Sequence, residues 1–405
     1  MESLMSKVTS THEVVIVGGG IYGTSLAYEL ASRGRDVLLL ESGEIASGAS
    51  GGPGERGVRA NNRDIRELPV VSLSIDRWQA FQEKFEGGVG YRRLGGLQVF
   101  DLPYGHREHE IRGRMEAKAA IQSALGTPSK ILSRDEVLAL EPEMSRSIVG
   151  AMFCPNDGVG DHTFATRQFA KAAEAAGATI RTSAKVSELL ADRGRIRAVR
   201  LVDGEEIGVG DKLFVMSNAG APALLAEHVG QGALPPTWNL MPQMMYVTNP
   251  ENHTIKHLVS HAHRRLAIKQ LPDGTIMLSG GVSVSHKEGR VHIGSLSATA
   301  INLTDSIMTF PFLDRSEFVQ VDATRVDTNA LDDIPIIDQP RHLPNLYYGY
   351  AWSGHGFAIS LGFTKLFADW AETGEKPAEL EPFSPNRFTL SAKARVEPSR
   401  LALTA

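Results

Sequence analysis

Three glycines at fixed spacing, placed between an apolar run and a helical pattern, constrain the fold of this 405-residue chain more than any other feature. The run Glu13–Val17 is apolar on both faces, which is typical of a strand inside a parallel sheet. Gly18-x-Gly20-x-x-Gly23 follows at once, and Ile21–Arg33 carries apolar and small residues at helical spacing. A second apolar run, Val37–Leu40, completes a βαβ unit. We therefore predict an α/β protein that contains a Rossmann-like domain.

The glycine spacing in this context is the fingerprint of dinucleotide binding. Gly18 permits the tight turn, Gly20 lets a diphosphate approach the backbone, and Gly23 lets the helix pack closely on the strand. The helix N-terminus offers free N–H groups to the phosphates. Glu41 ends the second strand, where its carboxylate can accept hydrogen bonds from ribose hydroxyls and would repel a 2′-phosphate. The alternative interpretation is a glycine-rich turn with an unrelated surface glutamate.

A second glycine turn helps to distinguish an FAD-binding protein from an NAD-binding one, because the first motif occurs in both. Ser353–Phe357 reads SGHGF, and it stands between a predicted strand at Leu346–Tyr350 and a predicted helix at Phe357–Trp370. A helix N-terminus directed at the flavin ring stabilises the negative charge that arrives on reduction. Two such helix ends favour FAD. The alternative is an ordinary connection between a strand and a helix.

Composition excludes several classes of protein. Lys and Arg total 42 against 47 Asp and Glu, so a nucleic-acid-binding protein is not expected. The single cysteine, Cys154, cannot form an internal disulfide or a cysteine-rich metal site. The polar start Met1–His12 and the lack of an apolar run of ~18 residues predict a cytoplasmic protein without a membrane span.

The pattern changes along the chain in a way that predicts two domains. Parallel-type patterns occur near both ends and in the middle, whereas Met241–Phe312 mainly alternates, as in an antiparallel sheet. We predict an FAD-binding domain assembled from residues 1–60, 150–230 and 325–390. Residues 61–149 and 231–324 form a substrate domain with a mixed or antiparallel sheet, and 391–405 form a loosely attached tail.

Two sets of cations are candidates for chemistry. Arg56 and Arg59 follow the Gly-rich loop, and arginine suits two-point binding of a carboxylate. Arg63 and Arg66 lie close by, so the four arginines could instead form a solvated face. Lys269 falls in an alternating segment, where it could organise a water or superoxide near flavin N5 or be a solvated strand lysine.

The histidines do not predict a metal site. His253, His257, His261 and His263 follow no known ligand spacing, and no acidic residue lies inside that group. His162 is expected to begin the helix that continues from Thr163 to Gly177.

Taken in order, these motifs resemble the D-amino-acid-oxidase-like FAD-dependent superfamily. The segments that carry the resemblance are Val17–Gly23, Glu41 with Ala46–Ser50, Gly57–Asn61, Arg264–Gln270, Trp352–Phe357 and Pro382–Phe388. Within the superfamily the similarity is greatest to sarcosine oxidases, both monomeric and beta-subunit, and to glycine oxidase and proline dehydrogenase. The resemblance implies FAD beneath a substrate sheet and oxidation of a C–N bond.

The resemblance also implies roles for particular residues. Arg59 matches the arginine that holds the substrate carboxylate, Arg56 its neighbour over the flavin, and Lys269 the lysine that promotes reaction with oxygen. Arg325 lies near the carboxylate-binding arginine of glycine oxidases. His162 falls near the histidine that holds FMN in sarcosine-oxidase beta subunits, although we do not expect FMN here.

Two departures from the family pattern matter. No cysteine lies near Asp332–Pro335, where monomeric sarcosine oxidases attach the cofactor, so we predict non-covalent FAD. Ala358 replaces a lysine that helps to bind the substrate carboxylate, which favours a larger substrate held in another way. The residues expected to bind FAD are Gly18, Gly20, Ile21, Tyr22, Gly23, Glu41, Ser42, Ala49, Ser50, Val186, Ala219, Gly220, Gly354, His355, Gly356, Phe357 and Ala358.

The sequence therefore predicts an FAD-dependent oxidase of a secondary amine or N-substituted amino acid, with O2 as acceptor and H2O2 as product. An alternative on the same scaffold is a 2-hydroxy-acid oxidase, for which His355 is the candidate base. A third possibility is an FAD-binding dehydrogenase subunit of an electron-transfer complex.

Overall fold

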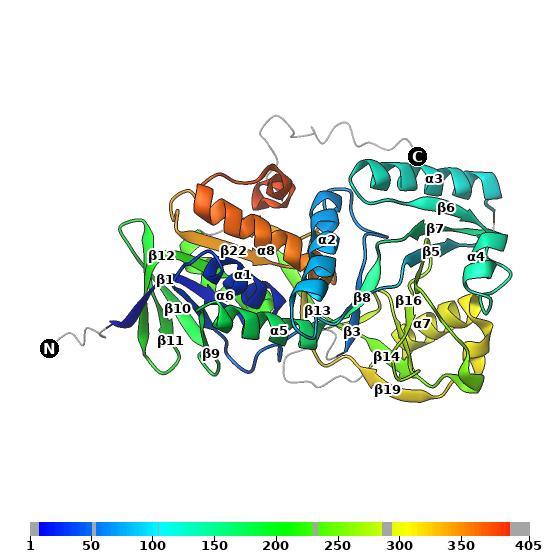
Figure 1. The fold of residues 1–405 in the computed structure, drawn as a ribbon, viewed down its shortest axis with the longest axis horizontal. Helices are drawn as coiled ribbons and strands as arrows, with labels where there is room; N and C mark the ends of the chain where they lie inside the picture. Colours follow the sequence, from blue (N-terminus) through cyan, green and yellow to red (C-terminus); the bar gives the residue numbers. More distant parts are fainter. Residues whose placement is uncertain (1–7, 51–53, 104, 230–233, 286–293, 389–405) are drawn as a thin grey trace, which may run out of the picture.

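The computed structural model describes residues 8–50, 54–103, 105–229, 234–285 and 294–388. The predicted tail at 391–405 and residues 51–53 of the Gly-rich loop lie outside the described residues. Two eight-stranded sheets dominate the fold. Figure 1 shows the first sheet with helices α1, α5 and α8 toward one end of the long axis, and the second sheet with α3, α4 and α7 toward the other.

The first sheet contains the predicted βαβ unit. Its strands run in the order β10-β11-β12-β1-β2-β9, and β22 pairs with β12 and β21. Pairing is parallel from β22 through β12, β1 and β2 to the edge strand β9. It is antiparallel among β10, β11 and β12 and between β21 and β22. The strands are β1 (Val8–Val17), β2 (Val37–Leu40), β9 (Thr179–Arg181), β10 (Val186–Asp192), β11 (Arg195–Leu201), β12 (Glu206–Val215), β21 (Ile336–Asp338) and β22 (Leu346–Tyr350).

Helices cover both faces of this sheet, which explains why its central strands are apolar throughout. One core unites a face of the sheet with α1 (Ile21–Ala31), α2 (Leu68–Lys84), α5 (His162–Ala175) and α8 (Gly356–Thr373). The other face packs against α6 (Ala221–Val229). Helix α5 begins at His162, as expected, and the Asp161 carboxylate caps it by accepting a hydrogen bond from the N–H of Phe164 at 2.9 Å.

The second sheet runs β19-β14-β17-β16-β15-β5-β7-β6 and is antiparallel except between β15 and β5. Its strands are β5 (Gly96–Phe100), β6 (Lys130–Ser133), β7 (Gly150–Cys154), β14 (Met244–Val247), β15 (Leu258–His261), β16 (Ala267–Gln270), β17 (Ile276–Ser279) and β19 (Phe318–Asp322). Two three-stranded sheets, β3-β8-β4 and β18-β13-β20, complete the strands. They comprise β3 (Glu55–Val58), β4 (Tyr91–Arg93), β8 (Gly158–Asp161), β13 (Thr237–Pro242), β18 (Ser283–Ser285) and β20 (Asp327–Ala330).

The helices of this part are α3 (Glu108–Ala124), α4 (Arg134–Leu140) and α7 (Leu296–Thr309). Helix α7 corrects the expectation that Met241–Phe312 is mainly strand. Its buried positions are small or polar, among them Ala298, Asn302 and Ser306, whereas Leu296 is 92% exposed. Asn302 donates from its amide to the carbonyls of Arg265 and Ser279 at 2.7 and 2.9 Å. Because polar contacts mark the buried face, the apolar pattern gave no helical period.

The predicted fold class is confirmed: the chain is a mixed α/β protein with a Rossmann-like sheet. The strands of that sheet come from three separate segments, within 8–40, 179–215 and 336–350. The predicted domain limits remain a proposal that this division supports.

Candidate active site

The first glycine turn has a geometry that few side chains could accept. Gly18 has a φ of +115°, and a Cβ there would lie 2.9 Å from the carbonyl oxygen of Met216. A Cβ on Gly23 would overlap the carbonyl oxygen of Gly18, so this glycine allows close packing of helix on strand. Around a Cβ on Gly20 there is nothing within 4 Å, which leaves the backbone open to a ligand.

The carboxylate of Glu41 lies beside this turn. It accepts hydrogen bonds from the backbone N–H of Gly19 at 2.6 Å and of Gly43 at 2.7 Å. These contacts fix its position at the end of β2, on the wall of a large cavity. A carboxylate held there can accept hydrogen bonds from the hydroxyls of a ribose.

The cavity has a volume of about 1220 Å³ and is lined by residues from both large sheets. That volume exceeds the roughly 300–1,000 Å³ of a pocket for one drug-sized ligand. Of the residues predicted to bind FAD, all line the cavity except Gly23, which packs inside the turn, and Ala219. The cavity therefore has room for a dinucleotide together with a small substrate.

The second glycine turn is joined directly to the first. The ring of Tyr22 stacks on that of Trp352 with centroids 3.6 Å apart, and its hydroxyl donates to the carbonyl of Gly356 at 2.7 Å. The turn itself is strained, because Ala351 and Ser353 have φ values of +57° and +51°. These contacts hold the N-terminal ends of α1 and α8 together at the cavity wall.

Buried cations form another part of the wall. Lys269 is 3% exposed, and burial together with the charges of Arg56 and Arg59 lowers its pKa to about 7. The solvated strand lysine is thereby excluded for this position. Burial and the charge of Arg63 lower the pKa of Arg59 to about 10. The Arg59 side chain forms no hydrogen bond or ion pair with any residue that the structure describes, and its Nη1 is fully enclosed.

The four arginines do not share one environment. Arg63 is buried, lines the cavity and donates from Nε to the carbonyl of Arg59 at 3.1 Å, so it does not belong to a solvated face. Arg66 lies outside the cavity and pairs with Asp64 at 2.8 Å and Asp332 at 2.7 Å. Sequence reasoning missed Arg63, because residues 59–63 lie outside any helix or strand and their spacing gives no signal of direction.

Arg325 is not among the residues that line the cavity. Its Nη1 donates to the carbonyl of Ser47 at 2.9 Å. The structure thus brings Arg56, Arg59, Lys269 and His355 to one cavity but leaves Arg325 outside its wall.

His162 also lines the cavity. Its Nδ1 lies 3.1 Å from the carbonyl oxygen of Gly54 and so carries the proton, which leaves Nε2 as a buried acceptor without a partner in the described structure. Burial and the charge of Arg56 lower the pKa of this imidazole to about 4. His162 is therefore a neutral acceptor at physiological pH.

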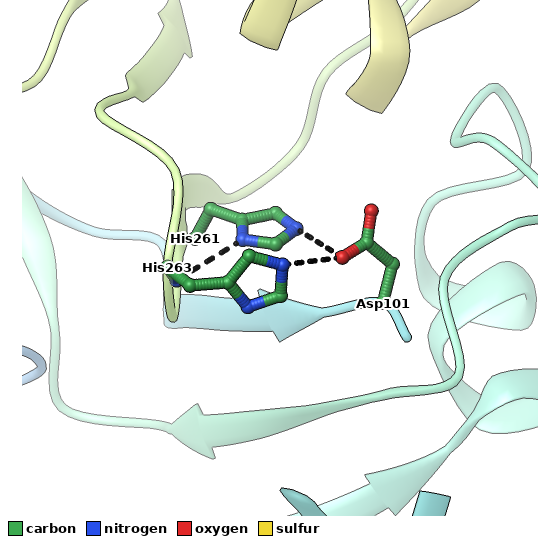
Figure 2. A group of neighbouring side chains, drawn as sticks. All are labelled: Asp101, His261 and His263. Carbon is green, nitrogen blue, oxygen red and sulfur yellow. Dashed lines mark hydrogen bonds and ion pairs between the residues drawn. The ribbon is translucent and has the colours of Figure 1, made fainter. Parts of the chain in front are cut away.

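Two of the four clustered histidines meet a carboxylate that sequence spacing did not reveal. Figure 2 shows His261 and His263 turned toward Asp101, which follows β5. Nε2 of His263 lies 2.5 Å from Oδ1 of Asp101, Nε2 of His261 lies 3.7 Å from the same oxygen, and Arg264 pairs with Oδ2. Each of the other two also faces an acid, His253 facing Glu143 and His257 facing Glu141.

This arrangement favours a hydrogen-bonded cluster over a metal site. The N–H of His263 donates to Nδ1 of His261 at 3.3 Å, so neutral His261 carries its proton on Nε2, the atom that a metal would need. Although burial alone would raise it, Arg264 and the two histidines hold the pKa of Asp101 below its usual range. That no metal binds here stays a prediction.

Residues 13–370 match the family of FAD dependent oxidoreductases named DAO, and the chain belongs to this family. Sarcosine oxidase subunit beta from Arthrobacter sp. is 23% identical over 380 residues, which cover 93% of this chain and 91% of that protein. Glycine oxidase from Bacillus licheniformis is 27% identical over 220 residues, or 53% of this chain and 56% of its own length. The predicted family membership is confirmed.

Solved structures agree with this assignment at the level of the fold. L-proline dehydrogenase from P. horikoshii superposes with a TM-score of 0.82 at 23% identity, covering 94% of this chain and 98% of that one. Glycine oxidase from Geobacillus kaustophilus superposes with a TM-score of 0.79 at 22% identity, covering 94% and 100%.

The residues present fit the FAD that the family implies. The open backbone at Gly20 and the fixed carboxylate of Glu41 suit a diphosphate and a ribose, and the cavity continues from them to the turn at Gly354. Among the described residues, no helix is long and apolar enough to span a lipid bilayer.

Proposed function

We propose that this protein is an FAD-dependent oxidase of a secondary amine or N-substituted amino acid that carries a carboxylate. The observation that carries the proposal is the unpaired guanidinium of Arg59 on the cavity wall, near Lys269. Burial removes water from a cation, and this cost in free energy is offset when an anion pairs with it. An anionic ligand in the cavity would supply that pairing. A carboxylate matches that guanidinium in charge and geometry.

When bound, FAD would accept a hydride from the substrate carbon next to nitrogen and pass the two electrons to O2, which gives H2O2. The residues of this chain then need to orient the substrate, keep its nitrogen neutral and exclude water. Loss of hydride leaves a C=N bond in the substrate, which water hydrolyses to an amine and a carbonyl compound. Arg59 holds the carboxylate, and Arg56 and Lys269 lend positive charge to the same region.

FAD is proposed to bind without a covalent link. Cys154 is buried, its thiol pKa is raised by burial and by the nearby Asp157, and it does not line the cavity. Precipitation of the purified protein with acid should release all of the flavin into the supernatant. If the yellow colour stays with the precipitate of the wild type but not with that of His162→Ala, the flavin is linked covalently to this histidine instead.

Anaerobic addition of candidate substrates tests the function. Bleaching of the flavin absorbance by carboxylated secondary amines, with H2O2 formed when air is admitted, is the expected result. Bleaching by 2-hydroxy acids alone would support the hydroxy-acid oxidase. If the flavin bleaches but no H2O2 forms, and turnover needs an added electron acceptor or partner, the protein is a dehydrogenase subunit. The similarity to a subunit of sarcosine oxidase is the reason to test this outcome.

A further inference from the structure

A fully buried glutamate lies behind the cavity wall, where none of the steps above uses it. Glu67 is 0% exposed and occupies the N-cap position of α2. Its Oε2 lies 3.4 Å from Nδ1 of His355, which belongs to the second glycine turn and lines the cavity. Within the described part of the chain, no other cation lies within ion-pair distance of this carboxylate.

A carboxylate that is buried in this way needs a positively charged or hydrogen-bonding partner. An ionised carboxylate without water is stable only when paired. Although burial alone would raise it, the nearby His355 and the charge of Arg63 bring the pKa of Glu67 below its usual range. Glu67 therefore stays ionised. At 3.4 Å the contact is an ion pair, since neither the carboxylate oxygens of Glu67 nor Nδ1 of His355 has a hydrogen-bond partner among the described residues. The negative charge favours a proton on Nδ1, which leaves Nε2 of the ring as a proton acceptor.

The backbone of the turn is fixed, so the Cα of His355 keeps its place at the cavity wall. The N–H of Gly354 donates to Asp327 at 2.6 Å, and Oγ of Ser353 accepts the N–H of Ala330 at 3.1 Å. Asp327 is itself held by the amide of Asn218 at 3.1 Å. A carboxylate, an imidazole and a rigid turn form the same chain of contacts that prepares a histidine base in other enzymes.

The proposed reaction requires such an acceptor. A secondary amine has a pKa near that of lysine, about 10, and so enters the cavity protonated at neutral pH. The ammonium form has no lone pair to assist the departure of hydride. We propose that Nε2 of His355 accepts the ammonium proton of the bound substrate, and that Glu67 is the positioning residue that holds the imidazole in the accepting form. This inference rests on the proposed function.

The step balances without a further reactant. The substrate N–H bond breaks, an Nε2–H bond forms, and the resulting imidazolium is paired with ionised Glu67. The proton then leaves to water through the cavity. The charged or titratable groups that face this pair are Arg63 and Asp64 before α2, Tyr22 on α1 and Asp327 on β20.

Other acceptors on the cavity wall are less suited. Nε2 of His261 carries its proton, and Nε2 of His263 is hydrogen-bonded to Asp101. His162 has a free Nε2, but burial lowers its pKa to about 4, so it is a weak base. Lys269, with a pKa lowered by burial to about 7, is the rival that the experiment must separate.

The test is the pH dependence of anaerobic flavin reduction in Glu67→Gln, with bound flavin measured by absorbance. The carboxamide cannot pair with the imidazolium that proton transfer creates, so the acidic limb of the kred/Kd profile should differ from that of the wild type. The plateau should fall by roughly tenfold or more, because the imidazolium loses its partner and the tautomer of the ring is no longer fixed. Glu67→Asp should restore part of both.

Glu141→Gln is the matched control. Glu141 is also fully buried and lies 2.7 Å from a histidine, His257, but neither residue lines the cavity. Its profile should keep the midpoint of the wild type. A second readout is the ¹⁵N spectrum of His355, assigned with His355→Asn, which should show the Nδ1–H tautomer in the wild type and a mixture in Glu67→Gln.

Unchanged midpoints in Glu67→Gln and His355→Asn, with an acidic limb abolished by Lys269→Met, would overturn the inference in favour of the lysine. Additive effects of Glu67→Gln and His355→Asn would also contradict it, because residues that act as one unit are not additive. If the wild type is reduced by no amine at all, the proposed function fails, and that result is distinct from the failure of this pair.

Discussion

The two walls of the cavity are built in different ways. The wall for the dinucleotide is made of backbone: glycine turns, two helix N-termini and one carboxylate fixed by N–H groups. The other part of the wall is made of side chains from distant segments, namely Arg59 and Arg63 after β3, Lys269 on β16 and His261 on β15. The backbone wall should tolerate almost no substitution, whereas each cation on the other wall should have a separable effect.

Gly23→Ala gives the largest expected effect. The new Cβ would overlap the carbonyl oxygen of Gly18, so α1 must move away from β1. We expect almost complete loss of bound FAD and a loss of about 2–4 kcal/mol in the free energy of unfolding. The ratio of flavin to protein absorbance and a urea melt measure both. Gly113→Ala, in the exposed middle of α3 with nothing within 4 Å, should retain FAD; equal losses in both variants would contradict the argument.

Arg59→Ala is expected to come next. Loss of the carboxylate partner should raise the apparent Kd or KM for a carboxylated amine by roughly 10²-fold, equivalent to about 3 kcal/mol, with FAD retained. Steady-state kinetics on the carboxylated amine and on its decarboxylated analogue measure the effect. Arg325→Ala should change KM by less than about twofold, since its guanidinium lies outside the cavity wall. If Arg325→Ala raises KM more than Arg59→Ala does, Arg325 and not Arg59 binds the substrate carboxylate.

Lys269→Met should act on reoxidation more than on reduction. Because the pKa of Lys269 is lowered by burial to about 7, its charge is present below pH 7 and is lost as the pH rises. Reaction of the reduced enzyme with O2 should therefore slow above pH 7 in the wild type. In the variant it should be roughly tenfold slower and independent of pH in this range. Stopped-flow mixing with O2 measures it, and Lys130→Met, on an exposed strand end, is the control.

Asp157→Asn should give the smallest effect. The carboxylate of Asp157 accepts the N–H of Ala60 at 2.6 Å and of Asn61 at 3.3 Å, directly after Arg59. Burial raises its pKa to about 6, so protonation below pH 6 weakens these contacts and should raise KM. Asp157 binds a proton more readily in the folded state than in the unfolded chain. The free energy of unfolding should therefore rise as the pH falls from about 6 to 3.8, because the buried carboxylate loses its charge. In Asp157→Asn we expect KM to be roughly threefold higher at pH 8 and flat with pH. A wild-type KM that does not change between pH 8 and 5 would refute this.

The sequence predicts the backbone wall well because its requirements are local. Gly18, Gly20 and Gly23 are dictated by contacts within a few residues of one turn, and the strands on either side of them are where the apolar runs indicate. The helix at Leu296–Thr309 was not predicted, because its buried face is polar and is satisfied by carbonyls of other strands.

The side-chain wall could be predicted only in part. Lys269 and Arg59 were candidates, but spacing could not show that one is buried and the other unpaired. Asp101 and Glu67 were not predicted at all, since each meets its histidine only through the folding of segments 160 and 288 residues apart. Resemblance to the family suggested Arg325, whose place outside the cavity wall depends on the local path of the chain before β20.

The central claim is that one cavity holds FAD against the backbone wall and a carboxylate against Arg59. A crystal structure of the yellow protein, soaked with a carboxylic acid that competes with the amine but lacks an oxidisable C–N bond, tests it most directly. The account predicts the diphosphate at the N–H groups of Gly20 and Ile21 and the carboxylate in two-point contact with Arg59. A diphosphate elsewhere, or a carboxylate bound by Arg264 or Arg325 with Arg59 uninvolved, would contradict it.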